Sequence, residues 1–243
     1  MQVDSGLIDR YVGVWNEPDP DTRRRRIESV WAPGGTTCYR LLDARGYEAI
    51  EARVTKSWER WLREGKYVFR PVKAISEDTA VKFEFAMVAT ADGKVEAQGL
   101  CYLLLDDDRR IAQDYQFNPT VDEAIDLAQK YLAPWNEPDE GVCRSLLAAL
   151  WAANCEYRDG HRKMRGLEQL AVGAAQTQRS LAADGRIMAP MGSSQRHHDV
   201  AHIAWQIVDS EGNAAAPTDS TLLVMDESQK ITAGYRFAER IAS

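Results

Sequence analysis

Hydrophobic residues recur at helical spacing near the start of the chain. The stripe consists of Leu7, Ile8, Tyr11, Val12 and Trp15. It stops near Glu17 and Pro18, because proline cannot continue a helix. Asp19 is a suitable N-cap for a second helix, which would carry Ile27, Val30 and Trp31 inward.

The pattern changes after this pair of helices. A short strand is predicted near Cys38 to Leu42, followed by a third helix over Tyr47 to Leu62. Alternating apolar and polar positions then predict four strands, around residues 67–75, 79–89, 95–105 and 109–117. Helices followed by strands indicate an α+β fold, with helices packed on one face of an antiparallel sheet.

The chain repeats itself half a length later. The segment "YVGVWNEPD", Tyr11 to Asp19, returns as "YLAPWNEPD", Tyr131 to Asp139, with six of nine positions identical at an offset of 120 residues. Other matches at this offset are Trp31-Ala32 with Trp151-Ala152, Gly46 with Gly166, Tyr115 with Tyr235, and Phe117 with Phe237. We therefore predict two homologous domains, residues 1–119 (unit one) and 120–243 (unit two).

Unit two repeats the order of elements. Helices are predicted near Asp122 to Trp135, Asp139 to Trp151 and Leu167 to Leu181, and strands follow as far as Phe237.

Composition and charge exclude several classes of function. The 243 residues are 44% hydrophobic and 28% charged with a net charge of −7, which is typical of a globular protein and argues against a nucleic-acid partner. No apolar run approaches the ~20 residues of a membrane helix, and the start lacks a signal-peptide pattern. Four cysteines without metal or disulfide spacing favour buried thiols in a reducing, cytoplasmic setting.

The element order, with "RYVGVWNEPD" closing the first helix, resembles the nuclear transport factor two-like superfamily. That superfamily includes SnoaL-like polyketide cyclases and ketosteroid isomerase. The resemblance implies two tandem cone-shaped α+β barrel domains, each a curved sheet wrapped on three helices around a pocket. It also implies an intrachain pseudo-dimer, which could assemble further, and chemistry without a cofactor.

Ketosteroid isomerase is most closely matched in unit two. Its helical tyrosine, general base and second acid correspond to Tyr131, to Asp159 in "CEYRDG", and to Asp219 in "APTD". In unit one only Tyr11 remains, since Leu41 and Gly99 stand roughly where the acids would be. All four histidines also lie in unit two, so we expect the active pocket there and a degenerate pocket in unit one.

The segment "RHHDVAHIAWQIV", Arg196 to Val208, is predicted as one strand. Alternation then places His198 and His202 on the same face, which suits a cavity wall near Asp219. The substrate-contacting residues are predicted to be Tyr157, His161, His202 and Tyr235. No metal site is expected, because His198 and His202 would lie about 13 Å apart on a strand.

Two functions follow from these residues, beside a third option of a purely structural interaction protein. The first is cofactor-independent acid–base catalysis, as in an isomerase, cyclase or dehydratase, on a small and largely apolar carbonyl compound. Asp159 would take a proton, Tyr131 and Asp219 would hold the oxyanion, and His198 would assist. The alternative is a SnoaL-like protein that binds a hydrophobic small molecule without catalysis.

Overall fold

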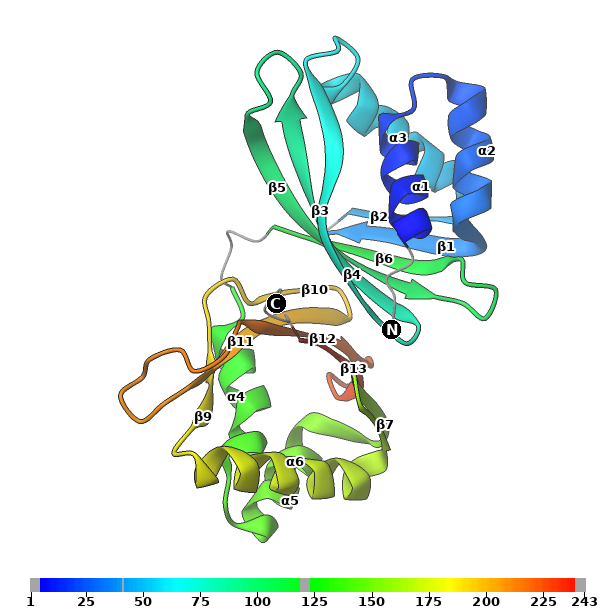
Figure 1. The fold of residues 1–243 in the computed structure, drawn as a ribbon. Coiled ribbons are helices and arrows are strands. Elements are labelled where there is room, and N and C mark those ends of the chain that lie inside the picture. The colour runs from blue at the N-terminus through cyan, green and yellow to red at the C-terminus, as the bar shows by residue number, and fades with distance from the viewer. Residues whose placement is uncertain (1–4, 41, 119–122, 239–243) are drawn as a thin grey trace. The chain divides into compact units, whose positions relative to one another are not determined.

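The computed structural model describes residues 5–40, 42–118 and 123–238, and the chain divides into two compact units, Met1–Pro119 and Thr120–Ser243. The elements of unit one are α1 (Ser5–Asn16), α2 (Pro20–Val30), β1 (Trp31–Tyr39), β2 (Leu42–Arg45), α3 (Gly46–Trp61), β3 (Tyr67–Glu77), β4 (Ala80–Ala89), β5 (Val95–Leu105) and β6 (Ile111–Phe117) (Figure 1). The elements of unit two are α4 (Ile125–Asn136), α5 (Glu140–Leu150), β7 (Trp151–Asp159), β8 (Arg162–Arg165), α6 (Gly166–Ala183), β9 (Ile187–Pro190), β10 (Gln195–His197), β11 (Val200–Val208), β12 (Asp219–Met225) and β13 (Ile231–Phe237).

Each unit contains one sheet, and both sheets are mixed. The first has the order β2-β1-β6-β5-β4-β3, and the second has the order β10-β11-β12-β13-β7-β8 with β9 paired to β11. The pairs β1–β6 and β13–β7 are parallel, whereas an antiparallel sheet was predicted. The first strand of each unit pairs with the last across a long connection, which allows it to run in the same direction. The predicted α+β class is confirmed.

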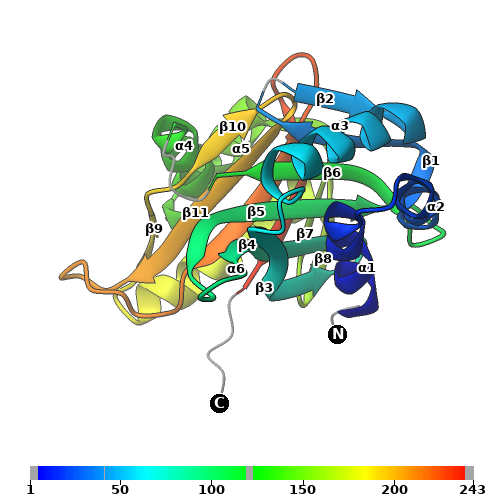
Figure 2. The same cartoon turned by 90° about the horizontal axis from the view of Figure 1, so that it is seen from above.

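The three helices of unit one lie together on one side of its sheet (Figures 1 and 2). The predicted stripe of α1 is buried there against Val81, Phe83 and Leu103 of the strands. Unit two has an equivalent core around Trp135, Trp151 and Trp205. No helix among the described residues is long and apolar enough to span a membrane.

The repeated "WNEPD" segment makes the same hydrogen bonds in both units. The Asn16 side chain bonds to both backbone groups of Phe69, at 2.8 and 2.9 Å, and Asn136 bonds likewise to Met188, at 2.8 Å each. Asp19 and Asp139 cap the next helix, each accepting a backbone N–H at 2.8 Å. The repeat therefore marks the joint at which α1 or α4 ends and is fastened to a strand.

One boundary differs from its prediction in both units. Trp31 and Trp151 were predicted to end the second helix, but each begins a strand with an extended backbone. Their side chains are nevertheless buried, as expected, because the strand starts beneath the helices.

Candidate functional site

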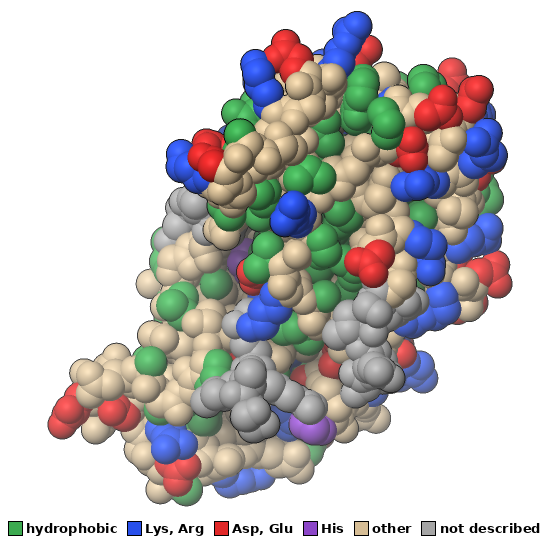
Figure 3. Space-filling model, turned by 45° about the horizontal axis from the view of Figure 1, so that its top comes forward, with side chains coloured by type: hydrophobic (Ala, Val, Ile, Leu, Met, Phe, Trp, Pro, Cys, Tyr) green, Lys and Arg blue, Asp and Glu red, His purple; other side chains and the backbone are tan. Residues whose placement is uncertain are grey.

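A cavity of about 900 Å³ lies in unit one, between the helices and the sheet. Its wall is mostly apolar, and includes Val12, Trp15, Leu42, Ala49, Ala52, Trp61, Phe69, Phe85, Met87 and Phe117. Its polar lining residues are Tyr11, Tyr39, Asp43, Arg53, Lys56, Ser57, Arg60, Gln98, Gln116 and Asn118. Figure 3 shows hydrophobic side chains gathered in a hollow in the upper part of the view, with Lys and Arg side chains beside it. A cavity of this size with a mostly apolar wall is typical of a small-molecule site.

A buried carboxylate lies behind one wall of this cavity. Asp114 on β6 is fully buried, and its Oδ2 accepts hydrogen bonds from Tyr11 Oη at 2.8 Å, Thr37 Oγ1 at 2.8 Å and Gln116 Nε2 at 3.0 Å. Its Oδ1 has no hydrogen-bond partner among the described residues. Burial raises the pKa of Asp114, although Arg53 and the hydroxyl donors oppose this shift.

Two residues connect this carboxylate to the cavity. Gln116 Nε2 also donates to Tyr11 Oη at 2.9 Å, and Arg53 Nη2 donates to Gln116 Oε1 at 2.8 Å. Arg53 Nη1 donates to the Thr37 carbonyl at 3.1 Å, and its guanidinium lies over the Trp15 ring, 5.8 Å from the centroid. Burial, followed by the charge of Asp114, raises the pKa of Tyr11 well above its usual value, so Tyr11 is a neutral phenol.

The buried Asp114 makes a testable prediction about pH. Because the pKa of Asp114 is raised by folding, the protonated carboxyl is favoured, so stability falls as pH rises through the folded-state pKa. Asp114→Asn removes this loss, and its free energy of unfolding relative to the wild type should therefore increase from acid to neutral pH. Denaturant titration across that range measures the difference.

The control for this prediction is Asp209→Asn in unit two. Hydrogen bonds from the backbone of Asn213 lower the pKa of Asp209, so its stabilisation is present above the unfolded pKa and lost in acid. The two variants should depart from the wild type in opposite directions as pH changes. Parallel curves would contradict the assignment of Asp114 as the buried, pKa-raised group.

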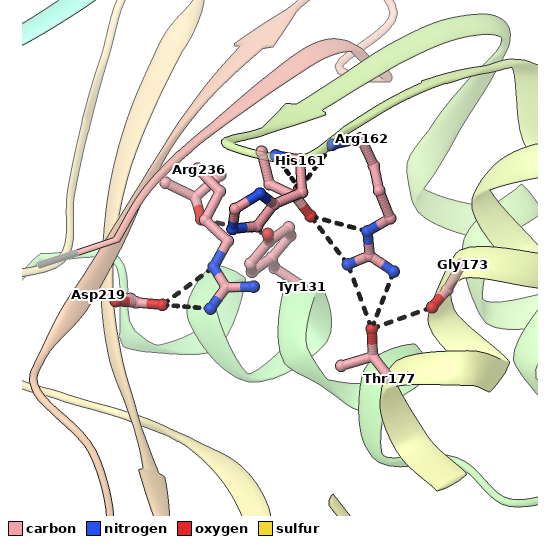
Figure 4. Close-up of polar contacts among 9 residues, drawn as sticks. Tyr131, His161, Arg162, Gly173, Thr177, Asp219 and Arg236 are labelled. Atoms are coloured by element: carbon pink, nitrogen blue, oxygen red, sulfur yellow. Dashed lines mark hydrogen bonds and ion pairs between the residues drawn. The ribbon is translucent and has the colours of Figure 1, made fainter. Parts of the chain in front are cut away.

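In unit two the predicted trio lies on the helix-facing side of the sheet, and each acid is held by its own arginine. Asp159 Oδ2 accepts from Arg162 at 2.8 and 3.1 Å, and Asp219 Oδ2 accepts from Arg236 at 2.6 and 2.9 Å. Tyr131 Oη lies 3.2 Å from Thr221 Oγ1. In Figure 4, Tyr131 is seen between the two arginine side chains. In unit two the Tyr131 hydroxyl thus lies against the Thr221 hydroxyl, whereas in unit one Tyr11 donates to the carboxylate of Asp114.

The two units differ at two pairs of residues that pack against each other. Thr37 and Asp114 are neighbours in the register of β1 and β6, and at the same offset unit two has Tyr157 and Gly234. A Cβ atom on Gly234 would lie 2.9 Å from Tyr157 Cδ2 and 2.8 Å from Trp151 Cη2, so aromatic rings occupy that position. Similarly, unit one has Arg53 and Ala44 where unit two has Gly173 packed under Met164.

Of the remaining predicted residues, His198 lies apart from the trio. The segment Arg196–Val208 is not one strand but a hairpin, because His198 adopts a left-handed backbone conformation (φ 53°) in the turn between β10 and β11. His198 is exposed there, while Asp219 pairs with Trp205, five residues along β11, or roughly 17 Å away.

The other predicted contacts divide between the two sheet faces. Tyr157 is buried in the helix-side core, and His161 is exposed in the turn after Asp159, to which its backbone N–H donates at 3.1 Å. His202 and Tyr235 lie on the opposite face, since they alternate with Ile203 and Gly234. No three His, Cys, Asp or Glu side chains of the described residues gather as a metal site requires.

Sequence comparison of the units missed Asp114, Arg53 and Gln116. The strand register aligns Tyr39, and not Leu41, with Asp159; Leu41 itself lies outside the described residues. Gly99 does align with Asp219, as expected, since they pair with Phe85 and Trp205. One signal was available: Asp114 stands in the middle of a predicted strand, and a carboxylate that is buried in a strand is rare unless it is paired.

No protein-family model matches the chain, and no curated protein matches it. Among solved structures, it is similar to a candidate isomerase of the SnoaL-like family from Agrobacterium tumefaciens, at 23% identity and TM-score 0.44, over 47% of this chain and 96% of that one. A candidate SnoaL-like polyketide cyclase from a Jannaschia species matches at 13% identity and TM-score 0.38, over 48% and 88%. A protein with a ketosteroid isomerase-like fold from Catenulispora acidiphila, in complex with trimethylamine, matches at 13% identity and TM-score 0.37, over 46% and 85%.

Each of these matches spans about half of the chain, and the same order of helices and strands is found in both units. The predicted resemblance is thus one of fold: the chain is similar to SnoaL-like structures over about half of its length, and its described elements form two α+β units in tandem.

Proposed function

We propose that the unit-one cavity binds a small, largely apolar carbonyl compound and that Tyr11 and Asp114 move a proton to and from the carbon beside its carbonyl. The observation that carries this proposal is the fully buried Asp114, bonded to Tyr11 on the wall of a cavity of about 900 Å³. A buried, pKa-raised carboxyl group that is hydrogen-bonded to a residue lining a cavity is a candidate acid–base group.

The proton transfer would pass through Tyr11, because Asp114 does not itself line the cavity. As the substrate C–H bond breaks, its proton moves to Tyr11 Oη, and the phenolic proton moves to Asp114 Oδ2. The electron pair of the C–H bond passes to the carbonyl oxygen and forms an enolate. Returning the proton to another carbon gives isomerisation, while attack by the enolate carbon on a second carbonyl gives an aldol-type cyclisation.

The developing oxyanion needs a positive partner away from Asp114. Arg53 supplies that charge on the cavity wall, where its hydrogen bonds to Thr37 and Gln116 fix the guanidinium in place. Gln116 contributes an amide beside it. Such fixed donors stabilise a charge that appears only during reaction, because they need no reorganisation.

The catalytic role of Tyr131, Asp159, Asp219 and His198 stays a prediction. We favour unit one because Asp114 retains an oxygen without a hydrogen-bond partner, while both oxygens of Asp159 accept hydrogen bonds from its own turn. A second candidate function is binding without turnover. The distance that Asp114 keeps from the cavity surface favours it, since the carboxylate then serves to orient Tyr11.

Exchange of deuterium into a simple ketone tests this proposal without knowledge of the substrate. We would follow exchange at the α-carbon of 1-tetralone in D₂O by NMR, with wild type, Tyr11→Phe, Asp114→Asn and Asp159→Asn. Wild type should accelerate exchange, and Tyr11→Phe and Asp114→Asn should each lower the rate about 100-fold or more. Loss with Asp159→Asn alone would move the chemistry to unit two. Binding of the ketone without any accelerated exchange would establish the non-catalytic function.

A further inference from the structure

We infer that the ligand of the unit-one cavity is an amphipathic carboxylate, whose anionic group is bound by Lys56 and Arg60 on α3; this inference rests on the proposed site but not on its reaction. The observation behind it is the distribution of charge on the cavity wall. Arg53, Lys56 and Arg60 all line the cavity, and Asp43 is the one carboxylate among its lining residues.

These three cations are placed by the helix itself. They are three and seven residues apart in α3, which is the spacing of one helical face, and this face turns toward the cavity. Ala49 and Ala52 lie on the same face, and their small side chains leave room beside the charges. A ligand in the cavity would therefore meet a cationic helix on one side and apolar strands on the other.

Lys56 and Arg60 differ from several other surface cations of this unit, which form ion pairs. Arg24, Arg26 and Arg110, for example, each form ion pairs with carboxylates at 2.8 to 3.6 Å. Lys56 and Arg60 form no ion pair among the described residues, and Arg60 instead lies over the ring of Trp61, 4.5 Å from its centroid. Asp43 accepts a bond from Cys38 Sγ at 2.7 Å.

Unit two provides an internal comparison. At the same offset of 120 residues, Arg53, Lys56 and Arg60 are replaced by Gly173, Gln176 and Ser180 on α6. The fold therefore does not need cations at these positions. The three cations are found in the unit that also has the cavity of about 900 Å³ and the buried Asp114.

The geometry also sets the length of the ligand. Arg53 lies beside Gln116, next to Tyr11, while Arg60 is seven residues further along α3, or roughly 10 Å at a rise of about 1.5 Å per residue. A carbonyl at the Tyr11 end and a carboxylate at the Arg60 end would thus be separated by a body of about two fused rings. Such a body matches the apolar wall formed by Phe69, Phe85 and Trp61.

The test compares two probes that differ by the carboxylate alone. We would titrate 2-naphthol and 6-hydroxy-2-naphthoate into the full chain by calorimetry. The wild type should bind the naphthoate at least tenfold more tightly at low salt, because Lys56 and Arg60 attract the carboxylate. The double variant Lys56→Gln, Arg60→Ser carries the unit-two residues and should lose this preference while retaining its affinity for 2-naphthol.

The matched control is Arg25→Gln, which removes an exposed cation on α2 that does not line the cavity. It should leave both affinities unchanged. A wild type without preference for the naphthoate, or a double variant that keeps it, overturns the inference alone. If 2-naphthol binding is absent or unaffected by Tyr11→Phe, the proposed site itself fails.

Discussion

Thr37→Tyr is expected to destabilise unit one by about 3 kcal/mol or more, although the same position of unit two holds a tyrosine. In unit one the new ring would meet the carboxylate of Asp114, its register neighbour on β6. It would also remove the hydroxyl that donates to Asp114 Oδ2 at 2.8 Å. The buried space accepts either a carboxylate or a phenol ring, but not both.

Asp114→Gly is the second substitution that is needed to reproduce the packing of unit two in unit one. Alone, it should destabilise unit one by about 2–3 kcal/mol, because Tyr11, Thr37 and Gln116 lose a common acceptor and a void remains. Combined with Thr37→Tyr, it recreates the pair Tyr157 and Gly234, which is well packed in unit two. The double variant should therefore be more stable than the sum of the two single effects by about 2 kcal/mol.

Hydrogen exchange resolved by peptide measures this cycle, because it separates the opening free energies of unit one from those of unit two. Peptides from β1 and β6 should lose protection from exchange in the single variants, and peptides from β7 and β13 should lose none. Additive single effects would mean that Thr37 and Asp114 do not share one space, and the account of why the units differ would fail. The double variant should also lose the ketone exchange activity, since the proton acceptor is gone.

The duplication and the fold were predictable because their signals are local. Asn16, Glu17 and Asp19 form hydrogen bonds within a few residues of the helix end or to the backbone of β3. The same residues are therefore found at the corresponding helix end of each unit. The apolar stripe of α1 likewise depends only on helical spacing. These features survive in both units although most other positions have diverged.

The candidate site was not predictable in the same way, because it depends on which strands are neighbours. Asp114 is 103 residues from Tyr11 and 77 residues from Thr37 in the sequence. Thr37 meets it through the parallel pairing of β1 with β6, where an antiparallel sheet was expected. All four histidines lie in unit two, and this clustering favoured unit two as the place of the active pocket. The polar groups of the unit-one cavity include no histidine at all.

The second large effect is expected at Arg23, the buried member of the run Arg23 to Arg26. Its Nε donates to the Glu17 carbonyl at 2.9 Å, its Nη2 to the Pro18 carbonyl at 3.1 Å, and its Nη1 to Thr55 Oγ1 at 2.7 Å. Its guanidinium also lies over Trp58, 5.3 Å from the ring centroid. Arg23 therefore fastens the end of α1 to α3, the two helices that carry Tyr11 and the cavity cations.

Arg23→Ala should lower the free energy of unfolding of unit one by about 2–4 kcal/mol, since three partly buried hydrogen bonds from a charged donor are lost at once. Arg23→Lys should recover only part of this, because an ammonium group cannot reproduce the planar fork. Arg25→Ala, at an exposed neighbour, is the control and should change little. Denaturant titration with peptide-resolved hydrogen exchange provides the measurement.

A further substitution, Arg23→Cys, connects the stability of unit one to ligand binding in its cavity. Unit two has Cys143 at this position, whose thiol donates to the Pro134 carbonyl at 3.3 Å and does not reach α6. Arg23→Cys should therefore keep a hydrogen bond to the backbone of α1, as Cys143 has to α4, and lose the bond to α3. If α3 is held in place by Arg23, this variant should bind 6-hydroxy-2-naphthoate more weakly than the wild type, and by a larger factor than it binds 2-naphthol. Equal affinities in Arg23→Cys and the wild type would mean that the sheet and α3 alone set the position of Lys56 and Arg60.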